Sequence, residues 1–175
     1  LEGEVKERFN EIAKELSQIK TDFSNHVLDA TKAFELILTD PDAAKGWPRS
    51  LREVAAQSYH QSKKEEDDAS PEAGPCRITL DYPSFMPVMQ HHRGRDDREQ
   101  VYRAYVTRAS EGELDNSGLI EKILKLRKEQ SGLLGFATFA ELSLDSKMAP
   151  DVEAVEKMFE QLLSASKLYM KKEFE

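Results

Sequence analysis

The chain has 175 residues, of which 39% are hydrophobic and 33% charged, and its formal net charge is −8 at pH 7. This length fits one domain or a part of a larger protein, and the composition is ordinary for a soluble helical protein. The acidic balance disfavours a general nucleic-acid binder, because phosphate contacts need clustered Lys and Arg. The single cysteine, Cys76, excludes an internal disulfide and a cysteine-rich zinc site, and no run approaches the roughly 20 apolar residues of a membrane span.

A long amphipathic helix is predicted from Glu2 to about Leu28. Its apolar residues recur every three or four positions, which places them on one face: Val5, Phe9, Ile12, Leu16, Ile19, Phe23 and Val27. A stripe this narrow resembles a coiled-coil seam. We therefore expect it to need a partner surface, either from another helix of the chain or from outside it.

A small β-ribbon is predicted next. Residues Ala33–Leu38 alternate with period two and Arg77–Leu80 are rich in strand formers, so we expect the two segments to pair. Between them, Ser50 can cap a short helix from Leu51 to Tyr59. The following residues 60–75 carry almost no apolar side chain, which predicts a mobile, charged surface loop.

The rest of the chain is predicted to be helical. Proline and capping signals mark the starts, and Gly135 marks one end. The expected helices are Ser84–His91, Asp96–Arg108, Leu119–Leu134, Phe139–Leu144 and a last helix that begins at Pro150 and packs through Val155, Phe159, Leu162 and Leu163. The fold class is therefore mainly α with a two-stranded ribbon.

His91 and His92, followed by Asp96 and Asp97, form the strongest local candidate for a metal site. Imidazole and carboxylate are common zinc and iron ligands. Adjacent residues on a regular helix point about 100° apart, however, so both histidines cannot face one metal. Only His92 and Asp96 have the spacing of a helical pair. We favour a solvated helix end, and we expect that replacing both histidines with alanine costs little.

Other chemistry has no local signature. Ser84 lacks a GxSxG elbow, Cys76 lacks a nearby histidine motif, and no HExxH is present. The acidic run Glu65–Asp68 is expected to be hydrated, whereas a general acid or base needs a fixed position. Tyr102 and Tyr105 are interpreted as packing residues. The glycines form no phosphate-binding spacing and are interpreted as turn or packing residues: Gly112, Gly118, Gly132 and Gly135. We therefore predict no catalytic, cofactor-binding or metal residue in this chain.

Successive segments nevertheless resemble the oligopeptidase A and thimet oligopeptidase family of zinc metallopeptidases, and within it the plant or algal oligopeptidase A-like branch. The segments that carry the resemblance, in order, are FSNHVLDATKAFELILTD, WPRSL, RITLDYPSFMPVMQH, REQVYRAYVTRAS and LDNSGLIEKILKLRKEQSGLLGFATFAELSLDSKMA. It extends from about Leu1 to Ser166, and the final LYMKKEFE departs from the expected pattern. The resemblance implies a partial N-terminal helical domain over residues 1–175, in a neurolysin- or thimet-oligopeptidase-like lobe that forms part of a peptide channel wall.

In such enzymes zinc is held by an HExxH helix and a downstream glutamate, and none of these residues maps onto this chain. The resemblance thus implies zinc in a catalytic half outside the chain, short peptides as substrates, and the chloroplast, the mitochondrion or the cytosol as compartment. Because the chain begins at Leu1, we interpret it as processed, trimmed or part of a longer product. The alternative is a truncated, non-catalytic relative that serves as a binding or assembly subunit, with the Val5–Val27 stripe as its docking face.

Two further expectations follow. Phe85 should be a core residue. An exposed apolar patch should lie either along Val5, Ile12, Ile19 and Phe23 or around Phe159 and Leu163, because a lobe without its partner half exposes a surface that is normally buried.

Overall fold

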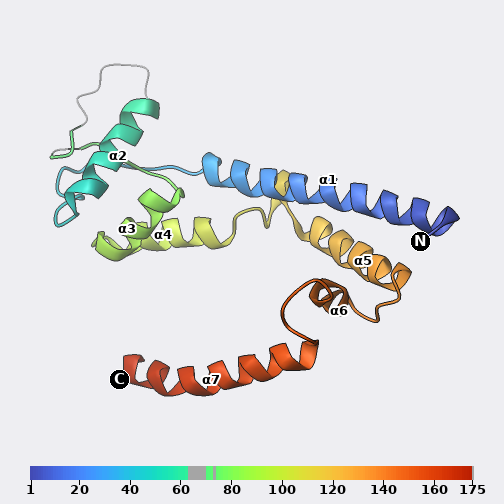
Figure 1. Ribbon diagram of the computed structural model, residues 1–175. Coiled ribbons are helices and arrows are strands. Elements are labelled where there is room, and N and C mark those ends of the chain that lie inside the picture. Colours follow the sequence, from blue (N-terminus) through green and yellow to red (C-terminus); the bar gives the residue numbers. More distant parts are fainter. Residues whose placement is uncertain (63–69, 73, 175) are drawn as a thin grey trace. The chain divides into compact units, whose positions relative to one another are not determined.

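The computed structural model describes residues 1–62, 70–72 and 74–174. Within these residues the chain forms seven α-helices, a short 3₁₀ helix and a two-stranded sheet (Figure 1). They fall into two compact units: residues 20–118, and residues 1–19 together with 119–175. None of the described helices is long and apolar enough to cross a membrane. The mainly helical fold with a small ribbon confirms the predicted fold class.

The unit of residues 20–118 is built around the ribbon. It contains the end of α1 (Gly3–Ala33), then β1 (Leu36–Leu38), α2 (Arg49–Ser62), β2 (Cys76–Ile78), α3 (Tyr82–His91), α4 (Arg95–Val106) and the 3₁₀ helix η1 (Gly112–Leu114). The strands pair antiparallel, with Leu36 opposite Ile78 and Leu38 opposite Cys76. Both α2 and α3 pack against β2, which supplies the cover that an isolated ribbon needs.

The core of this unit joins side chains from the ribbon, the three helices α2 to α4 and the loop before α2. Its buried members are Ala44, Trp47, Leu51, Ala55, Cys76, Ile78, Leu80, Phe85, Val88 and Val101. Phe85 is 7% exposed, which confirms it as a core residue. The pairing of the two predicted strand regions is also confirmed.

Several element boundaries differ from the prediction, and each has a local cause. α1 continues past Leu28 to Ala33, and Thr31 fits inside it because its hydroxyl donates a hydrogen bond to the Val27 carbonyl at 2.7 Å. β1 is accordingly shorter than predicted. β2 ends at Ile78, because the backbone N–H of Thr79 donates instead to the Ser84 hydroxyl at 3.0 Å.

The predicted charged loop of residues 60–75 begins later than expected. α2 extends through Ser62, where the Ser62 hydroxyl donates to the Tyr59 carbonyl at 2.8 Å. Ser70 and Gly74 form an isolated antiparallel bridge. Residues 63–69 and 73 of the predicted loop lie outside the described part of the chain.

The second unit joins the start of α1 to α5 (Ser117–Leu133), α6 (Phe139–Leu144) and α7 (Val152–Phe174). Its buried core contains Ile12, Leu16 and Ile19 of α1 with Leu126 of α5. The α1 stripe therefore finds its partner within the chain. This contradicts a free α1 docking face, and the patch expected along Val5, Ile12, Ile19 and Phe23 is absent, since Ile12 is 0% and Ile19 4% exposed.

Ion pairs border this α1–α5 contact. Arg8 donates from Nε and Nη2 to the two carboxylate oxygens of Glu129 at 2.6 and 2.8 Å, and Lys122 pairs with Glu15. The Arg8 guanidinium lowers the pKa of the Glu129 carboxyl. The four side chains are 34–53% exposed, so these ion pairs contribute little to stability.

α7 differs from the other long helices because none of its described residues is buried. It packs lightly on α6, which begins with the predicted capping box between Thr138 and Glu141. Large apolar side chains along α7 are at least 48% exposed: Met158, Phe159, Leu162, Leu163, Leu168, Tyr169, Met170 and Phe174. The prediction that α7 packs through Phe159, Leu162 and Leu163 is wrong for the described chain, whereas the expected exposed patch around Phe159 and Leu163 is present.

Candidate functional site

The histidine and acidic cluster singled out in the sequence forms the corner between α3 and α4. His92 is the residue after α3 and has extended backbone angles, with φ −72° and ψ 132°. Its side chain is 3% exposed, and Nε2 lies 2.8 Å from Oδ2 of Asp97. The imidazole also makes an edge contact with Trp47, with ring centroids 5.5 Å apart. His92 is therefore a buried residue at the end of α3 that contacts both Asp97 of α4 and the core residue Trp47.

Gly94 is required at this corner by the closeness of the pair. A Cβ added there would lie 2.5 Å from Oδ2 of Asp97 and 2.6 Å from Nε2 of His92. Arg98 closes the corner from the other side, because its guanidinium donates to the carbonyl oxygen of His92. The sequence HHRGRDDR thus encodes a tight, hydrogen-bonded connection.

The geometry corrects two predictions about the histidines. His91 is exposed, as expected of a helix end, but His92 is buried and paired. Its partner is Asp97 rather than Asp96, because α3 ends at His91 and the four-residue helical spacing does not apply across the turn. The expectation that both histidines can be replaced at little cost is therefore revised for His92.

The corner does not fit a metal ion. His92 and Asp97 supply two donors, whereas structural and catalytic zinc sites use three or four protein ligands. No group of three or more His, Cys, Asp or Glu residues that could hold a metal occurs among the residues the structure describes. The Glu65–Asp68 run lies outside them.

The candidate nucleophiles have structural contacts. Cys76 is buried in β2, and burial raises the pKa of its thiol, which disfavours the reactive thiolate. Ser84 is 3% exposed and its hydroxyl accepts the Thr79 N–H. Of the glycines, Gly135 adopts φ 83° just after α5, where only a residue without a side chain is unstrained.

The two tyrosines of α4 have different surroundings. Tyr105 stacks on Phe85 with ring centroids 3.9 Å apart, and the Arg108 guanidinium lies 3.7 Å from the Tyr105 ring centroid. Tyr102 is 52% exposed, so its interpretation as a packing residue is wrong. Positions three, four or seven apart on a helix lie near one another on its surface, so Tyr102 lies near positions 95, 98, 99 and 106 as well as near Tyr105.

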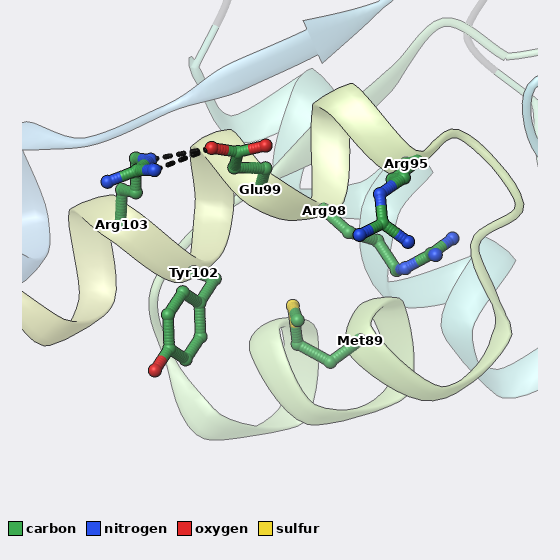
Figure 2. Close-up of a pocket in the computed structure, with 6 residues that line it drawn as sticks. All are labelled: Met89, Arg95, Arg98, Glu99, Tyr102 and Arg103. Carbon is green, nitrogen blue, oxygen red and sulfur yellow. Dashed lines mark hydrogen bonds and ion pairs between the residues drawn. The ribbon is translucent and has the colours of Figure 1, made fainter.

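That exposed face borders a hollow of about 420 Å³ that the sequence reasoning missed. Figure 2 shows its lining: Met89 of α3, and Arg95, Arg98, Glu99, Tyr102 and Arg103 of α4. The available signal was the segment RDDREQVYR, in which Arg95 and Arg98 are three positions apart and Tyr102 follows Arg98 by four, the spacing of neighbours on a helix surface.

Comparison with known proteins decides the family. The model of peptidase family M3 matches residues 88–175, half of the chain. The chain belongs to peptidase family M3. This match runs through the last residue, so the final LYMKKEFE lies within the family region, contrary to the prediction that it departs from it.

Curated proteins similar to this chain include oligopeptidases A from a plant and from a bacterium. The chain is 47% identical over 166 residues to the probable cytosolic oligopeptidase A of Arabidopsis thaliana, a match of 95% of this chain and 23% of the relative. It is 48% identical over 95% of its length to the organellar, chloroplastic/mitochondrial oligopeptidase A of the same plant, and 21% of that relative is covered. Oligopeptidase A of Haemophilus influenzae is 39% identical over the whole chain and 25% of the relative. The chain thus spans about a quarter of the length of the curated relatives it matches.

Proposed function

We propose that this M3 chain is a non-catalytic part of an oligopeptidase that degrades short peptides, and that it forms part of the wall of the peptide channel. The observation that carries the proposal is the similarity to two plant oligopeptidases A over 95% of the chain. The names of these relatives support the cytosol, the chloroplast or the mitochondrion as compartment.

Zinc is assigned to residues outside this chain. M3 peptidases are generally zinc-dependent, but the sequence contains no HExxH. The described residues also bring together no group of three or more His, Cys, Asp or Glu side chains that could hold a metal ion. Bond cleavage therefore belongs to a catalytic half, and this chain contributes binding surface and rigidity.

The α7 helix supplies the surface on which that half would pack. Its apolar residues Phe159, Leu162 and Leu163 are 59%, 56% and 56% exposed and lie within one turn. Exposed clusters of large apolar side chains mark interaction surfaces. The same exposure is the observation that favours the second candidate, a truncated homologue that docks through α7 as an assembly subunit without peptidase activity.

A chimera tests the proposal. The segment of the cytosolic Arabidopsis relative that aligns with this chain is replaced by the chain, and cleavage of an internally quenched short peptide is measured. We expect kcat/KM within about tenfold of the parent enzyme, a loss of about 1.4 kcal/mol or less, because the zinc site stays intact and the helical lobe is retained.

The controls separate folding from function. The parent with the segment deleted should be inactive, and chelation followed by zinc addition should abolish and restore cleavage by the chimera. A folded, zinc-loaded chimera that cleaves no peptide would contradict the channel-wall role and favour the assembly subunit.

A further inference from the structure

The hollow beside α4 concentrates positive charge in an acidic chain. Three of its six lining residues are arginines and one, Glu99, is acidic, whereas the chain as a whole carries a net charge of −8. All six residues belong to the unit of residues 20–118. Such a local reversal of charge attracts small anions.

The partners of these groups show which arginine is free. Arg103 is held by Glu99, with N–O distances of 2.7 and 2.8 Å, and Arg98 donates to the His92 carbonyl. The nearby Asp97 carboxylate is engaged by His92. Arg95 has no hydrogen-bond or ion-pair partner within the described chain. Arg98 is thus fixed by the α3–α4 corner, and Arg95 is available beside it.

Two largely apolar side chains, Tyr102 and Met89, line the hollow together with the arginines. Tyr102 follows Arg98 by four positions on α4 and is 52% exposed, and the half-buried Met89 of α3 lines the same hollow (Figure 2). Of the two tyrosines of α4, Tyr105 packs against the core by stacking on Phe85. Core packing therefore does not account for Tyr102. Tyrosine, methionine and arginine are the side chains enriched where proteins bind partners.

We propose that this hollow is a binding site for the carboxylate of a short peptide, with the carboxylate on Arg95 and Arg98 and an adjacent apolar side chain on Tyr102 and Met89. A guanidinium matches a planar carboxylate with two parallel hydrogen bonds. Arg98 keeps free donors for this after its bond to His92, because a guanidinium has five N–H groups. Its prior fixation also reduces the ordering cost of binding.

The carboxylate can come from a peptide C-terminus or from an acidic side chain, and the two sources are distinguished by the probes. One probe is an acetylated Ala-Leu dipeptide with a free C-terminus. The second is an acetylated Leu-Glu amide, and the third is an acetylated Leu-Gln amide without any carboxylate. Each is titrated into the isotope-labelled 175-residue chain, and the amide shifts of α3 and α4 are followed by NMR.

We expect saturable shifts around Arg95, Arg98 and Tyr102 with at least one carboxylate probe, and none with the Leu-Gln amide. Arg95→Gln should weaken binding by at least about tenfold, since it removes a charge-assisted pair, while Arg95→Lys should retain part of the affinity. Tyr102→Ala should weaken binding of the same probe without abolishing its salt dependence. The matched control is Arg49→Gln, which removes an exposed arginine paired with Glu53 on α2 and should leave affinity unchanged.

Three results would overturn the site. The Leu-Gln amide would bind as well as the carboxylate probes, or no probe would cause saturable shifts at millimolar concentration. Alternatively, inorganic phosphate at matched ionic strength would displace the bound peptide as effectively as a carboxylate probe, which would make the hollow a general anion pocket. The binding is measured without a catalytic half, so its outcome is independent of the proposed peptidase role.

Discussion

Replacing Phe85 with alanine should lower the free energy of unfolding of the unit of residues 20–118 by about 3–5 kcal/mol. Phe85 is 7% exposed in the core formed by the ribbon and α2 to α4, and its ring stacks on Tyr105 at 3.9 Å. Truncation removes both the buried area and the stacking contact, and it leaves a cavity between α3 and α4. Urea denaturation followed by the fluorescence of Trp47, the single tryptophan, reports on this same core.

Tyr82→Ala is the matched control for Phe85. Tyr82 lies on the same helix, α3, but is 69% exposed, so its loss should change stability by no more than about 0.5 kcal/mol. A cost below about 1 kcal/mol for Phe85→Ala would mean that the core collapses around the gap or that Phe85 is not packed as described.

His92→Ala is the second large effect, at about 2–3 kcal/mol of destabilisation. The substitution removes a buried ring that contacts Trp47 and a 2.8 Å hydrogen bond to Asp97. His91→Ala should fall within about 0.5 kcal/mol, because His91 is exposed. The pair of single mutants is again compared by urea titration with Trp47 fluorescence as the readout.

The double mutant of His91 and His92 should then lose no more stability than His92→Ala alone. Equal and small costs for the two single mutants would contradict the buried corner. If the purified parent chain contained bound zinc and the double mutant did not, the structural role assigned to His92 would be contradicted.

Helix starts were predictable where the chain carries a strong local signal. Pro83 in the first turn of α3 and the Thr138–Glu141 capping box of α6 both act within one helical turn. The pairing of the two strand segments was also predictable, because each is a short β-prone run bounded by turn residues.

Long-range contacts decided the features that were missed. Periodicity placed Tyr102 and Tyr105 together, but only the packing of α3 shows that Tyr105 enters the core and Tyr102 does not. The burial of His92 depends on Trp47, which is 45 positions earlier in the chain. Neither contact can be predicted from the spacing of residues within one helix.

The apolar pattern of α1 and α7 shows the same limit. Both helices carry apolar residues at helical spacing, yet Ile12 and Ile19 are buried whereas Phe159 and Leu163 are exposed. The pattern predicts that a face needs a partner. It does not say whether the partner is in the same chain.

The most direct test of the central claim is native mass spectrometry of the species that contains this chain, read together with its zinc content. The account predicts a mass several times the 19.9 kDa of the chain, with about one zinc per species. A 19.9 kDa species without zinc, or a large assembly without zinc, would contradict the assignment of the chain to a working oligopeptidase.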